Sequence, residues 1–225
     1  MAPMNRNDLT DFLLRCGVPA SRLADLSALE QLHTNLVEAN RTTNLTRITG
    51  EDEYWLLHVA DSLAVGLAAP DLMTDPLAVA DVGCGAGFPM LPLAWANLRL
   101  AVTGIDSRGK KIDFVRKQIA ALGLARCRAI HGRARELARQ GDHIAAYDAV
   151  LLRAVGAPTK LLRDCRPLVR PGGRIIFYAT PAGADEHRDA SAREASKLHL
   201  DLAESATVSL PHCAGQRKFI TFTHR

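Results

Sequence analysis

The chain has 225 residues, of which 48% are hydrophobic, and it carries a formal net charge of +4 with a pI of about 8.9. This length supports one substantial α/β domain with an accessory segment, and the mild basicity suits an anionic partner. No apolar run reaches the roughly 18 residues of a membrane span, the first residues lack a secretory core, and the five cysteines and eight histidines lack metal-ligand spacing. We therefore expect a cytoplasmic protein with no membrane association and no metal site.

The N-terminal part of the sequence predicts three helices, at residues 7–16, 19–40 and 51–67. In the third helix, His58 and Asp61 lie three residues apart and therefore share a polar face. Taken alone, this segment favours a polar face that is in contact with solvent.

The segment 68–75 has prolines near its ends and is the expected boundary between an N-terminal helical segment, residues 1–75, and a main domain, residues 76–225. In the main domain, apolar runs alternate with amphipathic stretches. The predicted strands lie at 77–82, 101–106, 127–130, 147–152, 174–179, 202–210 and 219–223. The predicted helices lie at 91–95, 109–122, 132–139, 158–169 and 184–198. This alternation predicts a doubly wound, mostly parallel sheet of seven strands.

The first predicted strand of the main domain ends in a glycine turn, with the sequence L-A-V-A-D-V-G-C-G-A-G-F-P. Alternate glycines at Gly83, Gly85 and Gly87 allow a sharp turn and a close approach of the backbone to a ligand. The spacing differs from the G-x-G-x-x-G pattern of dinucleotide-binding proteins, so a nicotinamide-dependent oxidoreductase is disfavoured. Asp106 ends the next apolar run, where a carboxylate can accept hydrogen bonds from both hydroxyls of a ribose.

Several stretches resemble the RsmG (GidB) family in matching order: D-V-G-C-G-A-G-F-P, D-S-R-G-K-K-I-D-F-V-R, H-G-R-A-R-E-L, Y-D-A-V-L-L-R-A-V and P-L-V-R-P-G-G-R. Upstream, N-L-T and H-V-A-D-S-L also match, as does L-P-H-C-A-G-Q-R-K-F-I near the end, so the resemblance covers about residues 36–220. The family consists of bacterial methyltransferases that act on small-subunit ribosomal RNA. The resemblance implies the class I (Rossmann-like) methyltransferase fold, S-adenosyl-L-methionine as cofactor, and N7 of one guanine in the 530 loop of 16S rRNA as target.

The resemblance and the glycine turn also assign site residues. The expected cofactor-binding residues are Gly83, Gly85, Gly87, Phe88, Asp106, Ala134, Arg135 and Arg153. The expected catalytic site consists of Arg153, Asn44, His58 and Asp61, with His58 and Asp61 ordering the loop that carries Asn44.

The chemistry agrees with this assignment. Adenosylmethionine has no phosphate, so a glycine turn without a phosphate-binding lysine is sufficient. Guanine N7 exposes a lone pair and loses no proton on attack, so the reaction needs proximity and orientation rather than a general base. The fork-shaped guanidinium of Arg153 suits either the O6 side of guanine or a phosphate.

A cluster of cations suggests how RNA is bound. Arg108, Lys110 and Lys111 crowd the start of a predicted helix, where the helix dipole disfavours positive charge. Contacts with RNA phosphates would account for this placement, and Arg47 extends the same patch.

Three positions depart from the family pattern. Met90 stands where relatives commonly have glycine, Leu152 stands where many have serine, and Ala179-Thr180-Pro181 replaces a lysine followed by glycine. The lost lysine affects contacts with the target more than contacts with the cofactor. We expect a monomer that acts on 16S rRNA or the small ribosomal subunit. The alternatives are a methyltransferase for another RNA or a small molecule, and a non-catalytic RNA-binding or assembly module.

Overall fold

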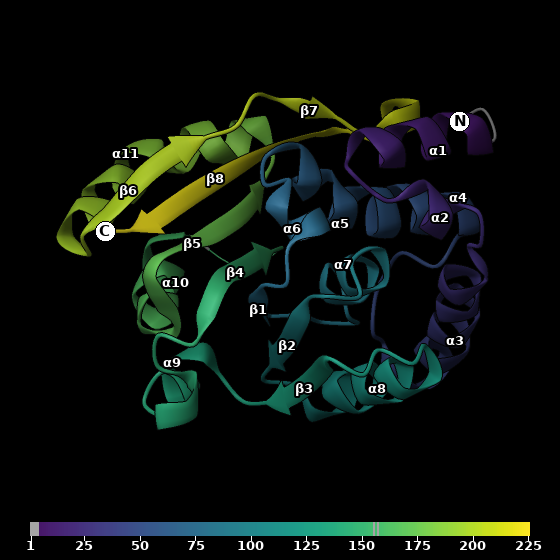
Figure 1. Ribbon diagram of the computed structural model, residues 1–225, viewed down its shortest axis with the longest axis horizontal. Coiled ribbons are helices and arrows are strands. Elements are labelled where there is room, and N and C mark those ends of the chain that lie inside the picture. The colour runs from purple at the N-terminus through teal and green to yellow at the C-terminus, as the bar shows by residue number, and fades with distance from the viewer. Residues whose placement is uncertain (1–4, 155, 157) are drawn as a thin grey trace.

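The computed structural model describes residues 5–154, 156 and 158–225. Within this part of the chain, one eight-stranded sheet runs through the molecule and helices cover both of its faces (Figure 1). The strands are β1 (Ala78–Val82), β2 (Ala101–Asp106), β3 (Cys127–His131), β4 (Tyr147–Arg153), β5 (Val169–Ala179), β6 (Leu200–Glu204), β7 (Val208–Ser209) and β8 (Gln216–His224).

The strand order is β3-β2-β1-β4-β5-β8-β6, and the two-residue strand β7 pairs with β8. Strands β1 to β5 are parallel, whereas β8 runs antiparallel between β5 and β6. The parallel part confirms the predicted doubly wound arrangement. Because β1 lies between β2 and β4, the strand order reverses at the carboxyl end of β1, which is where ligands bind in sheets of this type.

Helices from the N-terminal part and from the main domain together cover the sheet. The α-helices are α1 (Arg6–Arg15), α2 (Ala20–Leu23), α3 (Ser27–Thr43), α4 (Glu51–Glu53), α5 (Asp61–Leu63), α6 (Asp71–Thr74), α7 (Met90–Ala96), α8 (Gly109–Ala121), α9 (Ala134–Leu137), α10 (Pro158–Cys165) and α11 (Pro181–Lys197). Helices α9, α10 and α11 lie on one side of the sheet, while the N-terminal helices, α7 and α8 lie on the other (Figure 1).

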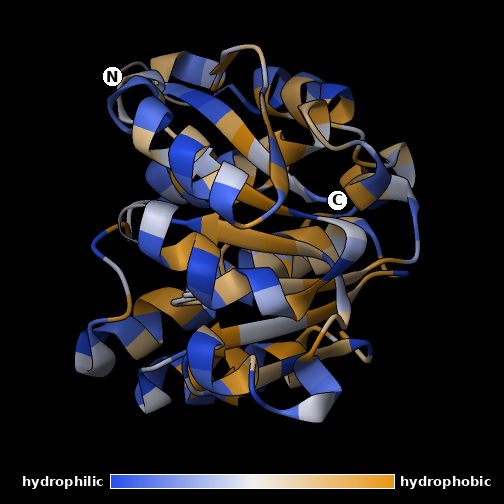
Figure 2. Cartoon of the chain, turned by 90° about the vertical axis from the view of Figure 1, so that its left-hand side faces the viewer, coloured by the Kyte–Doolittle hydropathy of each residue, from blue (hydrophilic) through white to orange (hydrophobic). Residues whose placement is uncertain are grey.

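Alternating residues of the strands build two hydrophobic cores. In β4, for example, Leu151 belongs to the core beneath the N-terminal helices, α7 and α8, while its neighbour Leu152 belongs to the core beneath α10 and α11. This follows from the two-residue period of a strand that is buried on both faces. Figure 2 shows the apolar strands between helices whose outer turns are largely hydrophilic.

The predicted helix at 19–40 is wrong in one respect, because the structure divides it into α2 and α3. The backbone N–H of Ser27 donates to Asp25 Oδ1 over 2.9 Å. A short polar side chain that bonds to backbone in this way starts a new helix rather than continuing the old one.

The predicted helix at 51–67 is also more complex than expected. It runs from α4 through a π-helix, Tyr54–Ala60, into α5 and then a 3₁₀ turn, Ala64–Leu67. The expected solvent-exposed face is wrong, since His58 and Asp61 are 6% and 2% exposed. The partners that allow this burial come from distant parts of the chain.

The remaining differences concern boundaries. The segment 68–75 contains α6 and is tied to the main domain, because the Asn97 side chain donates to the carbonyls of Leu72 and Asp75. Strand β5 begins five residues before the predicted Arg174, and the predicted strand at 202–210 is divided into β6 and β7.

Candidate active site

The glycine turn after β1 has the backbone conformation that its sequence predicts. Gly83, Gly85 and Gly87 have φ values of +77°, +57° and +95°, which are rare for residues with a side chain. A Cβ at Gly87 would lie 2.3 Å from Leu91 Cδ1, so this glycine allows α7 to pack against the turn. A Cβ at Gly85 would instead lie 3.7 Å from Lys111 Nζ at the mouth of a cavity.

The Asp106 carboxylate is held at the edge of that cavity by two backbone groups. The N–H of Gly85 donates to Oδ2 and the N–H of Arg108 donates to Oδ1, each over 2.9 Å. The carboxylate is therefore oriented in advance, and each oxygen keeps a lone pair for a further donor.

The cavity has a volume of about 770 Å³ and lies at the carboxyl ends of β1 and β2. Of the predicted cofactor-binding residues, the structure places Gly83, Gly85, Asp106, Ala134 and Arg135 in its lining. The lining also contains a group of cations, namely Arg108, Lys111, Arg133, Arg135 and Lys160. Among the residues described, no group of three or more His, Cys, Asp or Glu side chains is arranged to hold a metal ion.

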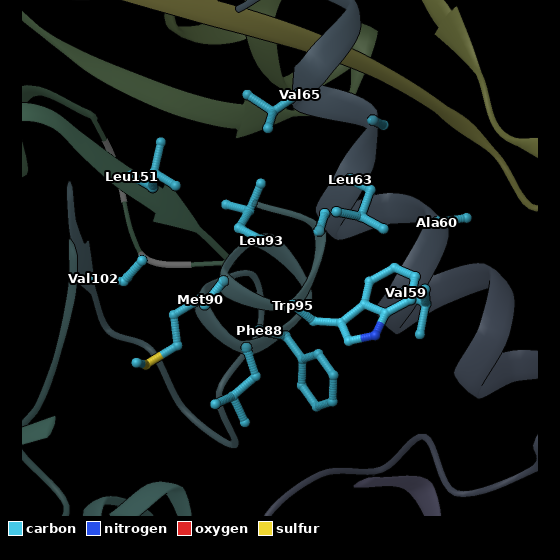
Figure 3. Packing of buried hydrophobic residues seen from close by; sticks show 14 of the residues in the cluster. Val59, Ala60, Leu63, Val65, Phe88, Met90, Leu93, Trp95, Val102 and Leu151 are labelled. Atoms are coloured by element: carbon cyan, nitrogen blue, oxygen red, sulfur yellow. The ribbon is translucent and has the colours of Figure 1, made fainter. Parts of the chain in front are cut away.

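Phe88 lies elsewhere, in the core between the glycine turn and the N-terminal helices. The residue is 7% exposed, and its ring stacks on His58 with 4.1 Å between the ring centroids. Figure 3 shows Phe88 in one cluster with Trp95 of α7 and Val59 of the π-helix. Burial lowers the pKa of His58 to about 3, so this imidazole is neutral.

The loop with the sequence N-L-T is ordered by Asn40 at the end of α3. Asn40 Oδ1 accepts from the N–H groups of Leu45 and Thr46, and the Thr46 hydroxyl lies 3.3 Å from His58 Nε2. Asn44 has a φ of +49° and is exposed, as is Arg47. The predicted link between His58 and this loop therefore runs through Thr46.

Asp61 joins three distant parts of the chain in a buried ion cluster. Its side chain is 3% exposed and accepts from Arg153 Nη2 and from Arg217 Nε, each over 2.7 Å. Arg153 also donates to the carbonyl of Leu57 in the π-helix. The cluster thus fixes the guanidinium of Arg153 at the end of β4 against the N-terminal helical segment.

Two residues of the site, Asp81 and Arg217, were not predicted from the sequence. Asp81 in β1 is fully buried, and its Oδ2 accepts from the N–H of Met90 over 3.0 Å, while Oδ1 has no hydrogen-bond partner among the residues that the structure describes. Desolvation raises its pKa to about 7. Asp81 could have been predicted, because an acidic residue inside an apolar strand is unusual. Arg217 could not, because it lies 156 residues from Asp61 and no local pattern links the two.

Of the predicted RNA-binding residues, two lie at the cavity and two do not. Arg108 and Lys111 line the cavity, and Lys110 is exposed on the same turn of α8. Arg47 lies on the separate loop after α3.

The architecture is a class I methyltransferase fold, as the comparison with solved structures shows. The chain is similar to M. jannaschii TYW2 in complex with AdoMet, with a TM-score of 0.53 and 15% identity over 69% of this chain and 72% of that one. It is also similar to precorrin-6y C5,15-methyltransferase from Geobacter metallireducens, with a TM-score of 0.51 and 12% identity over 71% and 88% of the two chains.

Sequence comparison gives the family. Residues 25–219 match the GidB model, which describes rRNA small subunit methyltransferase G. Proteins named ribosomal RNA small subunit methyltransferase G from Lactobacillus delbrueckii subsp. bulgaricus and Gloeobacter violaceus are 36% and 38% identical over 186 and 197 residues. These matches cover 82% and 85% of this chain and 77% of each relative. The chain therefore belongs to the rRNA small subunit methyltransferase G family and is an rRNA-methylating enzyme. None of its described helices is long and apolar enough to cross a membrane.

Proposed function

We propose that this protein transfers the methyl group of S-adenosyl-L-methionine to N7 of one guanine in the 530 loop of 16S rRNA. The observation that carries the proposal is the cavity over the glycine turn, with Asp106 oriented at its edge by two backbone N–H groups. Membership of a family that methylates small-subunit rRNA supports the choice of substrate.

The residues of the cavity fit this cofactor. Gly83 and Gly85 provide a floor without side chains, and Asp106 offers carboxylate oxygens to the ribose hydroxyls. Ala134 and Arg135 lie where the backbone after β3 could flank the adenine. When bound, adenosylmethionine supplies an electrophilic methyl group on its sulfonium.

The protein contributes orientation rather than proton transfer, because guanine N7 already carries a free lone pair. We propose that Asp61 and His58 act as positioning residues: Asp61 holds Arg153, and His58 holds Phe88 beneath the glycine turn. Arg153 would then shape the pocket at the end of β4, and Asn44, on its exposed loop, is proposed to contact the substrate. In this way residues 1–75 complete a site whose floor is built by residues 76–225.

Cations at the cavity, at the start of α8 and on the loop after α3 would hold the RNA backbone. Arg108, Lys110, Lys111 and Arg47 are proposed to contact phosphates of 16S rRNA or of the small ribosomal subunit. We propose that a monomer does this in the cytoplasm.

The test is incubation of small ribosomal subunits that lack the modification with labelled adenosylmethionine. The proposal expects one methyl group per 16S rRNA and binding of adenosylhomocysteine but not NADH. Transfer to a free metabolite without transfer to RNA would favour the small-molecule alternative, and RNA binding without any transfer would favour the assembly module. Asp106→Ala should weaken cofactor binding while the protein remains folded.

A further inference from the structure

Positive charge is concentrated in one segment of the chain. Residues 107–139 contain ten lysine and arginine residues but only two acidic residues, whereas residues 1–75 contain five basic and eleven acidic residues. The basic segment includes α8, β3 and α9. Strand β3 is the last strand of the sheet, and Figure 1 shows it with α8 at one edge of the molecule, opposite α1. The cationic character of the chain is therefore concentrated at this edge rather than spread evenly over the surface.

Three arginines of this segment lie outside the lining of the cavity. Arg126 directly precedes β3, Arg128 lies within it, and Arg116 of α8 donates from Nε to the carbonyl of Ala129 over 3.0 Å. All three arginines are exposed. Because Gly132 lines the cavity and a strand rises about 3.3 Å per residue, Arg126 lies roughly 20 Å from the cavity along β3. Arg116, Arg126 and Arg128 together are called the β3 edge surface below.

The guanidinium groups of the β3 edge surface are positioned by the protein but keep free donors. Arg128 Nε donates to Thr103 Oγ1 over 3.1 Å, and Arg116 has one exposed ion pair with Asp113, at 3.6 Å. Among the residues that the structure describes, no carboxylate forms an ion pair with Arg126 or Arg128. An arginine that is held through Nε still presents both Nη groups, and these match two oxygens of a phosphate.

A nucleic acid fits the β3 edge surface better than a protein does. An exposed edge strand can pair with a strand of another protein, but β3 has only five residues and Arg116 already bonds to the carbonyl of Ala129. The exposed residues of α8 and residues 123–129 include no aromatic side chain on which unpaired bases could stack. Arginines without aromatic neighbours suit the regular phosphate backbone of an A-form duplex.

We propose that the β3 edge surface binds a double-stranded segment of rRNA, at a distance from the cavity that holds the cofactor. The inference rests on the proposed function and adds a second RNA contact to it. The target guanine reaches the cavity, while a stem that adjoins the target loop lies along β3. Because the arginines contact the backbone, this surface contributes to affinity and to the orientation of the RNA, and it leaves the choice of base to the cavity.

The first test measures binding of the full-length protein to naked 16S rRNA at several salt concentrations. The double variant Arg126→Gln, Arg128→Gln should bind on the order of 10-fold more weakly near physiological salt. The slope of the logarithm of its binding constant against the logarithm of salt concentration should be smaller in magnitude by about 1.8, which is about 0.9 for each contact with a duplex. Binding of adenosylhomocysteine and the midpoint of thermal unfolding should be unchanged.

The matched control is the double variant Arg193→Gln, Lys197→Gln. It removes the same charge from two exposed positions of α11, which lies beside β6 at the other edge of the sheet (Figure 1). This control should bind 16S rRNA with the affinity and the salt dependence of the wild-type protein.

A competition experiment identifies the ligand and needs no substitution. A short RNA duplex without the target loop should displace 16S rRNA from the wild-type protein, and it should do so less effectively from the Arg126→Gln, Arg128→Gln variant. A single-stranded oligouridine of equal length should compete equally against both proteins. Competition by the single strand alone would overturn the assignment of a duplex.

Two further results would overturn the inference. One is an unchanged affinity and salt dependence in the Arg126→Gln, Arg128→Gln variant. The other is weaker binding of this variant to intact small subunits without weaker binding to naked 16S rRNA, because the partner would then be a ribosomal protein. All of these are binding measurements, so they decide the inference even if the wild-type protein transfers no methyl group and the proposed function fails.

Discussion

Two buried titratable residues, His58 and Asp81, fix the geometry of the site at a cost in stability, because burial disfavours their charged forms. His58 stacks on Phe88, and Asp81 bonds to the first turn of α7, so each helps to fix one side of the glycine turn. Burial disfavours the charged form of both, and it therefore moves the two pKa values in opposite directions.

The first prediction concerns the pH dependence of unfolding. Between about pH 4 and 7 the folded protein keeps the Asp81 proton while the unfolded chain loses it, so the free energy of unfolding falls as pH rises, by about 4 kcal/mol in all. His58 has the opposite effect. The unfolded chain protonates this imidazole below about pH 6.5, whereas the folded protein keeps it neutral down to about pH 3. The free energy of unfolding therefore falls as pH falls, by about 5 kcal/mol in all.

The two slopes oppose each other between about pH 4 and 6.5. Relative to the wild-type protein, Asp81→Asn should therefore lose more stability on acidification, and His58→Gln should lose less. Urea unfolding at several pH values measures both, with Asp142→Asn as a control for an exposed carboxylate. Parallel pH profiles for all the proteins would contradict this account.

The second prediction concerns the ion cluster of Asp61. Asp61→Ala leaves Arg153 and Arg217 without their carboxylate, and their side chains are only 13% and 18% exposed. We expect a loss of about 3 kcal/mol of stability, because uncompensated charges remain in a poorly hydrated place. Asp201→Ala removes an exposed pair with Arg225 and should cost less than about 1 kcal/mol. Equal losses in urea unfolding would show that the cluster has no special role.

At the scale of elements, the glycine turn combines a structural and a ligand-binding requirement in neighbouring residues. Gly87 faces α7, whereas Gly85 faces the cavity. The spacing of the glycines predicted this turn, because the backbone conformation is local. The π-helix could not be predicted in the same way. His58 inside it and Asp61 directly after it contact residues of the glycine turn, β4 and β8, which lie far away in the sequence.

The third prediction separates the roles of these two glycines. Gly87→Ala should destabilise the protein by about 3 kcal/mol, because the new methyl group meets Leu91 and the backbone conformation is unfavourable. Gly85→Ala should cost about 1 kcal/mol but weaken adenosylhomocysteine binding, because its methyl group enters the cavity. Thermal unfolding and calorimetric titration measure the two effects. The reverse order of stability would contradict the assignment of faces.

At the scale of the whole molecule, alternation of strands and helices was sufficient to predict the doubly wound sheet. The central strands β1, β2 and β4 are buried on both faces, so their apolar composition marks them. The ion cluster and the contact between α3 and α8 are long-range features that no local pattern encodes. Arg153 was found through the resemblance, but Arg217, which donates to the same Asp61 carboxylate, became evident only when the chain was folded.

The fourth prediction concerns the charged surface around the cavity. If Lys110 and Lys111 contact phosphates, replacing both with alanine should make RNA binding less sensitive to salt. In the double variant Lys110→Ala, Lys111→Ala, the slope of log Kobs, the observed binding constant, against log salt concentration should be smaller in magnitude by about 1.4. This is about 0.7 for each contact with single-stranded RNA. Lys117→Ala, exposed further along α8, should leave the slope unchanged. An unchanged slope in the double variant would remove these lysines from the interface.

The most direct test of the whole account is to map the methyl group on the RNA. Small subunits from a strain that lacks this gene are incubated with the protein and adenosylmethionine, and the 16S rRNA is then cleaved chemically at 7-methylguanosine and sequenced. The account predicts one new cleavage, at a guanine of the 530 loop, that disappears with Asp106→Ala. A methyl group on another atom or outside that loop, or no methyl group despite cofactor binding, would contradict it.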